Sequence, residues 1–401
     1  MNMEKISIKS KLMEGAFALM TVMSMSSCTG LVDAILGTED NPSGSSTKPT
    51  TVAGIPSDAS ATPNPTLPGT PNTTIPNPGS EVVTKSGQTV VNFNLTGILD
   101  PTQAGGWLKL YGTGAKIQNV WMSIDGNAKG IAVINTIDQS TVTSAVDLVF
   151  LVDNSGSMDE EADAVADGID AWAQKLSKTL DMKYGCVGYD GHLTGALNLT
   201  SVEDLSSYLT HGYGTNRTYH FGGADASTLQ TAASDYHNNY YECGVSALRF
   251  ATDQFNFRNG ANRVFVNFTD EPNQPNNQEK WSVEWVNPVN SNWTSSMGTI
   301  HTVFSNSYYY NDNYNWTPLH QEKPWLLSEY TGGTTKFAPS DFSGVTLDDL
   351  PITGALMNSY VISVTNVDSL FDGKEHTVKI TILNADGSIR AEKEFTMIFK
   401  K

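Results

Sequence analysis

Apolar runs of strand length alternate with helix-like patterns between residues 146 and 345 of the chain. The runs VDLVFLVD (146–153), RVFVNFTD (263–270) and GTIHTVFS (298–305) are largely apolar, which is typical of strands buried on both faces. After the first run, apolar residues recur at helical spacing from Ala162 to Leu176. This alternation predicts an α/β domain with a doubly wound, mostly parallel sheet that helices cover on both faces.

Two flanking regions show a different pattern, in which apolar and polar residues alternate. Residues 81–145 contain runs such as TVVNFNL and IQNVWMSI, and residues 346–401 contain HTVKITIL and AEKEFTMIF. Asp-Gly pairs at 372–373 and 386–387 are typical of hairpin turns. Both regions are therefore predicted to form short antiparallel strands.

Residues 1–27 have the pattern of a secretion signal, because lysines precede a short apolar stretch that ends in small residues. The sequence before Cys28 resembles a bacterial lipoprotein signal, which implies that Cys28 is lipidated. Residues 28–80 are rich in Pro, Thr and Ser, so we expect an extended tether that reaches on the order of 100 Å. No later segment is apolar enough to span a membrane. We expect a lipid-anchored protein of the bacterial cell envelope, on the outer membrane and exposed at the surface.

The net charge and the lack of a catalytic motif argue against two classes of function. A formal net charge of -18 over 401 residues argues against nucleic acid, whose phosphates require a basic surface. No Ser-His-Asp or Cys-His signature, paired-carboxylate motif or phosphate loop stands out, so the sequence does not indicate an enzyme. Cys186 and Cys243 are expected to be buried thiols, although an exported protein permits a disulfide between them.

The strand predicted at 146–153 ends in a series of oxygen-bearing side chains. Asp153, Ser155 and Ser157 follow at alternate positions, and Asp270 ends the strand at 263–270. Ligands of doubly wound sheets collect at the carboxyl ends of the strands, and two carboxylates at one edge need a compensating charge. All-oxygen ligands select a hard cation, so we expect Mg²⁺, or else Ca²⁺ or Mn²⁺. The alternative is an ordinary turn followed by a helix N-terminus.

Residues 146–345 resemble a von Willebrand factor type A (VWA) domain, and DNSGSM (153–158) resembles the metal-ion-dependent adhesion site of that family. TDE (269–271) and LLSEYTGG (326–333) match further parts of the family pattern in the same order. The resemblance implies that Asp153, Ser155, Ser157 and Asp270 hold the metal.

The third metal-binding segment of the family usually offers a threonine, and here the sequence departs from that pattern. YECGVSALRF (241–250) resembles instead the integrin-β-like branch, in which a glutamate precedes the helix. This implies Glu242 as a metal ligand; the alternatives in the preceding loop are Thr215, Thr218, Thr228 and Thr231. Asp159, Glu160 and Glu161 would complete an adjacent cation site of that branch, or they form a solvated helix N-terminus. The branch also implies that the α/β domain is inserted into a β-sandwich formed by the flanking regions.

Two long polar loops with aromatic residues, at 211–241 and 306–316, are predicted at the same edge of the sheet. Tyr, Asn, Ser and Gly are typical of adaptable binding surfaces. We expect a ligand rim of Tyr308, Tyr309, Tyr310 and Trp316, although simple packing explains such loops equally well. The histidines in this region lack the spacing of a zinc motif.

These features favour a cell-envelope lipoprotein that binds a protein or glycan partner through a divalent cation. An acidic group of the partner would complete the metal coordination, as the adhesion sites of the family are understood to work. The alternative is a structural component of an envelope or pilus-like assembly, in which the metal only stabilises the domain.

Overall fold

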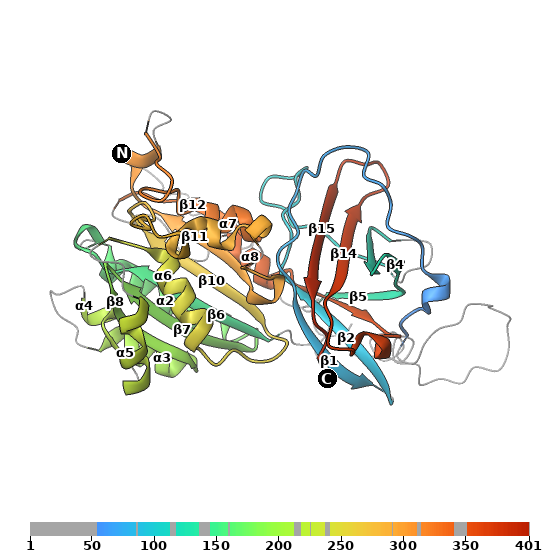
Figure 1. Ribbon diagram of the computed structural model, residues 1–401, viewed down its shortest axis with the longest axis horizontal. Helices are drawn as coiled ribbons and strands as arrows, with labels where there is room; N and C mark the ends of the chain where they lie inside the picture. The colour runs from blue at the N-terminus through green and yellow to red at the C-terminus, as the bar shows by residue number, and fades with distance from the viewer. Residues whose placement is uncertain are drawn as a thin grey trace, which may run out of the picture.

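The computed structural model describes residues 54–400, apart from 86, 113–117, 136–144, 159–160, 212–217, 225, 237–240, 291, 311–313 and 341–350. The predicted signal sequence and Cys28 lie outside the described residues. Figure 1 shows two lobes side by side, an α/β lobe from the middle of the chain and a β lobe from its two sides. Within the described residues, no helix is both long enough and apolar enough to cross a membrane.

The α/β lobe is built on a mostly parallel sheet. Its seven strands lie in the order β12-β11-β10-β6-β7-β8-β9, and among the paired neighbours only β7 and β8 run antiparallel. The strands are β6 (Val146–Asp153), β7 (Met182–Tyr189), β8 (Leu193–Thr200), β9 (Gly223–Ala224), β10 (Asn262–Thr269), β11 (Thr299–Phe304) and β12 (Thr335–Phe337). The predicted α/β class with a mostly parallel sheet is confirmed.

Helices cover both faces of this sheet (Figure 1). The core on one face contains residues of α2 (Ala162–Leu176), α3 (Val202–Thr210), α4 (Thr218–Phe221) and α8 (Pro351–Met357). The core on the other face contains residues of α5 (Ser227–Ala232), α6 (Gly244–Gln254) and α7 (Leu326–Thr331). Every residue of β6 is buried, with Phe150 in the first core and Leu151 in the second. A strand with alternate side chains in two cores has to be largely apolar, as the sequence pattern indicated. The carboxylate inside β6, Asp147, is paired with Arg258.

The β lobe consists of two small antiparallel sheets around a third core. One sheet has the order β1-β2-β13-β5, and the other has the order β15-β14-β3-β4. Strands from both sides of the α/β domain share each sheet, because β13 pairs with β2 and β5 while β14 pairs with β3. The bounds are β1 (Gly79–Lys85), β2 (Gln88–Leu95), β3 (Val120–Ile124), β4 (Asn127–Ala128), β5 (Ile131–Asn135), β13 (Tyr360–Val364), β14 (His376–Leu383) and β15 (Arg390–Met397).

Residues 54–78 lie along the β lobe, which differs from the free tether expected over residues 28–80. Ile55 and Ile75 are buried in the cores of that lobe. The Asn64 amide donates to Thr381 Oγ1 (2.9 Å), and Asp58 pairs with Lys129 (2.6 Å). Two isoleucines and several polar side chains thus hold this part of the expected tether on the β lobe.

The two lobes meet where β1 begins. The Asn77 backbone N–H donates to Thr299 Oγ1 (3.1 Å), and its side-chain amide donates to the Gly298 carbonyl (2.9 Å). Gly79 lies so close to the α/β lobe that an added Cβ would stand 2.9 Å from the Ala261 carbonyl oxygen. These contacts fix the start of the β lobe against β10 and β11.

The two described cysteines are buried free thiols, as expected. Cys186 lies in one core of the α/β lobe and Cys243 in the other.

We expect residues 355–401 to be unfolded as an isolated fragment. The fragment contains β13, β14 and β15, but the partners of β13 and one partner of β14 come from before residue 146. Unpaired strands with an open core are not stable in water. Far-UV circular dichroism of the fragment, with the full chain as control, checks this expectation. A monomeric fragment that melts cooperatively would contradict it.

A second prediction concerns the pH dependence of stability in the β lobe. His376 Nδ1 lies 2.7 Å from Asp125 Oδ2, and its Nε2 lies 3.0 Å from Asp372 Oδ1. The hydrogen bond to Asp125 is the largest cause that raises the pKa of His376, while the pKa values of Asp125 and Asp372 are lowered. Because the pKa of His376 is raised on folding, protonated His376 stabilises the fold. This stabilisation is complete at pH values below the ordinary histidine pKa near 6.5, and it is lost as pH rises through the pKa in the folded protein. The lowered aspartate values stabilise the fold above their ordinary range near 3.8, and this part is lost on acidification.

The protein with His376→Gln should therefore lose most stability relative to the natural chain between about pH 4 and 6.5, and less at about pH 9. Urea unfolding at several pH values measures the difference. A difference that does not depend on pH would contradict the ion-pair explanation.

Candidate functional site

The carboxyl edge of the central sheet brings together the predicted oxygen ligands. β6 and β10 are parallel neighbours in which Phe268 lies opposite Val152, so the two strands end at the same level. Asp153 is the last residue of β6 and has no exposed surface, and Asp270 follows β10 directly and is 5% exposed. The register therefore places two buried carboxylates side by side, although they are distant in sequence.

A short turn brings the two serines to the same point. The Ser155 backbone N–H donates to Asp153 Oδ1 (3.0 Å), and the 3-10 turn η2 (Gly156–Met158) follows. The Oγ atoms of Ser155 and Ser157 are 3.1 Å apart, and Ser157 Oγ donates to Asp270 Oδ1 (2.9 Å). Asp153, Ser155, Ser157 and Asp270 thus form one hydrogen-bonded cluster.

Thr269 belongs to the cluster, although the sequence analysis did not select it as a site residue. Its Oγ1 donates to Asp153 Oδ2 (2.8 Å) and accepts a hydrogen bond from the Glu271 backbone N–H (3.1 Å). Both oxygens of Asp153 are therefore held, one by the Ser155 backbone and one by Thr269. The available signal was that Thr269 opens the TDE segment that matched the family pattern.

Glu242 lies next to the cluster, directly before α6. Gln274 donates from its side-chain amide to Glu242 Oε2 (3.0 Å) and from its backbone N–H to the Glu242 carbonyl (2.9 Å), which holds the end of the loop. The charge of Glu242 contributes to the raised pKa of Asp153, so the two carboxylates interact electrostatically. Among the threonine alternatives, Thr228 and Thr231 are exposed on α5, Thr215 lies outside the described residues, and the side chain of Thr218 is not described.

Glu271 is a further carboxylate that the sequence analysis missed. Burial is the largest cause that raises its pKa to about 7, and the charges of Asp270 and Glu242 add to the rise. Tyr309 OH donates to Glu271 Oε2 (2.8 Å), which connects the predicted rim to the cluster. The residue type at the strand end was visible in the sequence, but only the fold shows that this side chain turns toward the site.

The carboxylates at this edge are ionised only at an electrostatic cost. Burial raises the pKa of Asp153 well above its usual range, and the charge of Asp270 raises it further. Burial also raises the pKa values of Asp270 and Glu242. Among the described residues, no Lys, Arg or His forms an ion pair with any of these three. The part of the chain that the structure describes therefore supplies no ion-pair partner to compensate for the cluster.

Glu161 does not form a solvated helix N-terminus. It is 1% exposed, and it accepts a hydrogen bond at Oε1 from Ser305 Oγ (3.0 Å), at the end of β11. The other two residues of the predicted adjacent cation site, Asp159 and Glu160, lie outside the described residues. Glu161 thus faces the protein interior beneath the edge of the sheet.

The predicted ligand rim lies at the same edge. Tyr308 and Tyr309 belong to the 3-10 turn η8 (Ser307–Tyr310) after β11, and the rings of Tyr309 and Trp316 are 6.0 Å apart. Tyr308 is 69% exposed, whereas Tyr309 is half-buried against Glu271. The side chain of Tyr310 is not described.

The donor set fits a hard divalent cation. Carboxylates and hydroxyls converge at the edge, and such oxygens are the ligands of Mg²⁺, Ca²⁺ and Mn²⁺ rather than of zinc. No group of three or more His, Cys, Asp or Glu in the described residues has the arrangement of a metal site. A cation would therefore depend on the hydroxyls of Ser155 and Ser157 as well as on the carboxylates.

No protein-family model matches the sequence, and no curated protein matches it. Three solved structures illustrate the similarities that a structural comparison found. The conserved hypothetical protein BatB from Bacteroides thetaiotaomicron is similar with 12% identity and a TM-score of 0.30, over 48% of this chain and 90% of that chain. The open pilus adhesin SpaC from Lactobacillus rhamnosus GG is similar with 11% identity and a TM-score of 0.31, over 83% and 48%. The vWF domain of the type V pili tip protein Mfa5 from Porphyromonas gingivalis is similar with 14% identity and a TM-score of 0.21, over 33% and 40%.

In the presence of chelator, we expect Asp270→Asn to stabilise the protein near pH 7.5 by a few degrees in melting temperature. A carboxyl whose folded pKa is raised binds more protons in the folded state, so its ionisation destabilises the fold as pH rises above its ordinary range near 3.8. The side-chain amide of Asn removes that charge and has nearly the same size as the carboxyl group of Asp. Thermal unfolding in chelator between about pH 5 and 8 measures the effect, with the exposed Asp235→Asn as matched control. Equal melting temperatures for both variants at all pH values would show that ionisation of buried Asp270 does not destabilise the fold.

Proposed function

We propose that the α/β lobe binds a divalent cation at the carboxyl edge of its sheet and uses it to bind a partner molecule. The observation that supports this most is the cluster of buried carboxylates around two serine hydroxyls, for which the described residues supply no positive charge. A bound cation compensates such a cluster directly. It also explains why hydroxyls, which are poor counter-ions but good metal ligands, point to the same place.

The residues that would hold the cation are Asp153, Ser155, Ser157, Asp270 and Glu242. Mg²⁺ is the preferred ion, with Ca²⁺ and Mn²⁺ as alternatives, because all the donors are hard oxygens. Thr269 acts through Asp153, whose Oδ2 it holds. The cation supplies one function, a positive charge that is open to an external oxygen ligand.

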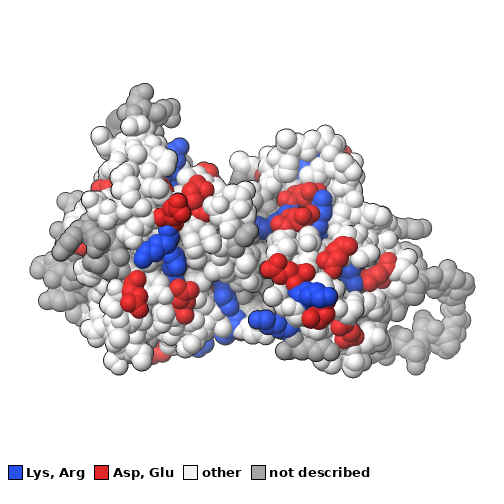
Figure 2. Space-filling model, in the orientation of Figure 1, with Lys and Arg blue, Asp and Glu red and all other residues white. Residues whose placement is uncertain are grey.

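The partner is a protein or a glycan that offers an acidic group to the cation. A carboxylate supplies hard oxygen, and the metal compensates its charge. The chain carries a net charge of -18. On the face of the molecule drawn in Figure 2, acidic and basic side chains are interspersed, without a broad basic patch. Attraction of an acidic partner must therefore be local to the metal and should vanish without it.

The proposed setting is the bacterial cell envelope. The lysines and the short apolar stretch before Cys28, together with the Pro-rich segment that follows, support a lipid-anchored protein on the outer membrane that is exposed at the surface. Protease treatment of intact cells tests this, because cleavage of the protein without cell lysis requires exposure at the surface. A fully protected protein would instead favour a structural role inside the envelope.

Replacing Ser155 and Ser157 together by Ala is expected to lower Mg²⁺ affinity at least about tenfold while the protein stays folded, because two oxygen donors are lost. Calorimetric titration with Mg²⁺ and Mn²⁺ measures the affinity, and thermal unfolding in chelator checks the fold. The matched control is Ser206→Ala with Ser207→Ala on α3, remote from the edge. Unchanged affinity in the folded Ser155 and Ser157 variant would sink the proposed site.

A further inference from the structure

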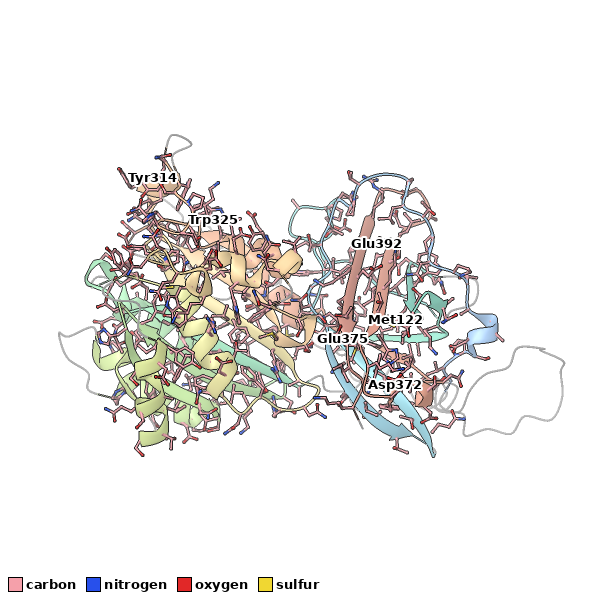
Figure 3. The ribbon with its side chains drawn as sticks, viewed as in Figure 1. Met122, Tyr314, Trp325, Asp372, Glu375 and Glu392 are labelled. Carbon is pink, nitrogen blue, oxygen red and sulfur yellow. The ribbon has the colours of Figure 1, made fainter. Side chains whose placement is uncertain are left out.

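A continuous series of aromatic rings leads away from the candidate metal site. We define the aromatic strip as Tyr308, Tyr309, Tyr314, Trp316, Trp325 and Phe337. Ring centroids along it are separated by 5.1 Å (Tyr308 to Tyr309), 6.0 Å (Tyr309 to Trp316), 5.2 Å (Trp316 to Trp325) and 5.3 Å (Trp325 to Phe337). Tyr314 packs on both Tyr309 (4.7 Å) and Trp316 (4.8 Å). Figure 3 shows Tyr314 and Trp325 at the same end of the α/β lobe.

The strip is continuous with the site at one end and open to solvent. Tyr309 donates its hydroxyl hydrogen bond to Glu271 of the carboxylate cluster. The outer members are exposed to solvent, Tyr308 by 69% and Phe337 by 47%. Phe304 is fully buried beneath the strip. Its ring centroid lies 6.2 Å from that of Tyr309 and 5.3 Å from that of Trp325, so the strip is anchored to the end of β11. Anchored aromatic rings offer contact area with little loss of conformational freedom on binding.

The chemistry of the strip favours a peptide over a sugar. The hydroxyls of Tyr309 and Tyr314 already donate within the protein, to Glu271 (2.8 Å) and Gln321 (2.6 Å). Most neighbouring rings meet edge to face, with interplanar angles of 83° for Tyr308 and Tyr309 and 83° for Trp316 and Trp325, so the surface is corrugated rather than flat. A sugar needs partners for its hydroxyls when they leave water, and the strip offers few. Aliphatic and aromatic side chains need only apolar area.

Lys323 adds one positive charge to the strip. Its ammonium lies 5.9 Å from the ring centre of Trp316 and 6.0 Å from that of Trp325. No described carboxylate forms an ion pair with it. In a chain of net charge -18, this is a local attraction for a second acidic group on the partner.

We propose that the partner is a protein segment in which an acidic residue is flanked by apolar side chains, and that these side chains pack on the aromatic strip. The proposal rests on the proposed metal function, which takes up the acidic residue. In an extended segment every second side chain points to the same face, at intervals of about 7 Å. The ring centroids are closer together than this, 5.1 to 6.0 Å apart, so the apolar side chains contact rings along the strip without matching them one to one. A second acidic residue reaches Lys323.

The test uses the full chain and three probes in Mg²⁺. Two are fluorescent hexapeptides with one central Asp, flanked in the first by Leu and Phe and in the second by Ser; the third is a fluorescent oligogalacturonate, a glycan with carboxylates. Fluorescence anisotropy should show that the Leu and Phe peptide binds at least about tenfold more tightly than the Ser peptide, because it buries apolar area on the strip. The oligogalacturonate should bind no better than the Ser peptide.

Variants of the strip isolate its contribution. Trp316→Ala with Trp325→Ala should remove the preference for the Leu and Phe peptide, and Tyr308→Ser should reduce it with less risk to the fold because that side chain is mostly exposed. Tyr111→Ala, an exposed tyrosine in the β lobe, is the matched control and should leave the preference unchanged. Lys323→Gln should weaken a peptide with a second Asp and leave the single-Asp peptide unaffected.

The outcomes separate this inference from the proposed metal function. If calorimetry shows no Mg²⁺ binding at the edge, the metal function fails. If Mg²⁺ binds and both peptides bind equally, or the oligogalacturonate binds most tightly, the metal function stands and the strip proposal is overturned. Persistence of the Leu and Phe preference in Tyr308→Ser and in the double tryptophan variant would also overturn it.

Discussion

The burial of neighbouring carboxylates is the constraint on which the proposed function of this protein depends. Parallel strands end at one edge, and here two neighbouring strands end in Asp153 and Asp270, both removed from water. Burial raises the pKa values of both carboxyls, and neighbouring charges raise that of Asp153 further, so ionisation of the site lowers the stability of the fold. Such a cost is typical of functional sites, where local interactions are arranged for a ligand rather than for stability.

The surroundings show how the fold holds these charges in place. Thr269 and the Ser155 backbone each hold one oxygen of Asp153, so the carboxylate has a fixed orientation before any ligand arrives. Glu242 is held in turn by Gln274. The aromatic strip begins where Tyr309 contacts Glu271, so the polar centre and the apolar surface are parts of one edge. Preorganised donors of this kind lower the cost of ordering the site on binding.

The insertion of the α/β lobe gives the site a rigid base. Both sheets of the β lobe are closed by strands from either side of the insertion, so the two ends of the α/β lobe are tied to one structure. Residues 54–78 lie along the outside of the β lobe. Near the end of this segment, Asn77 donates two hydrogen bonds to the start of β11. The strand that carries Phe304 and leads into the aromatic strip is thus fixed at both ends.

The sequence by itself determined the alternation of strands and helices, because buried strands and helix faces need apolar residues at characteristic spacings, as in β6 and α2. It also placed Asp153, Ser155, Ser157 and Asp270 at the ends of apolar runs, since an unpaired carboxylate is costly inside a strand that is buried on both faces. Asp147, inside β6, is paired with Arg258. Only the tertiary structure decided which further groups reach the site. Thr269, Glu271 and Lys323 are ordinary polar residues in sequence, and their roles follow from the parallel register of β6 and β10 and from the packing after β11. The course of residues 54–78 was likewise decided by a surface that forms only when both halves of the β lobe have met.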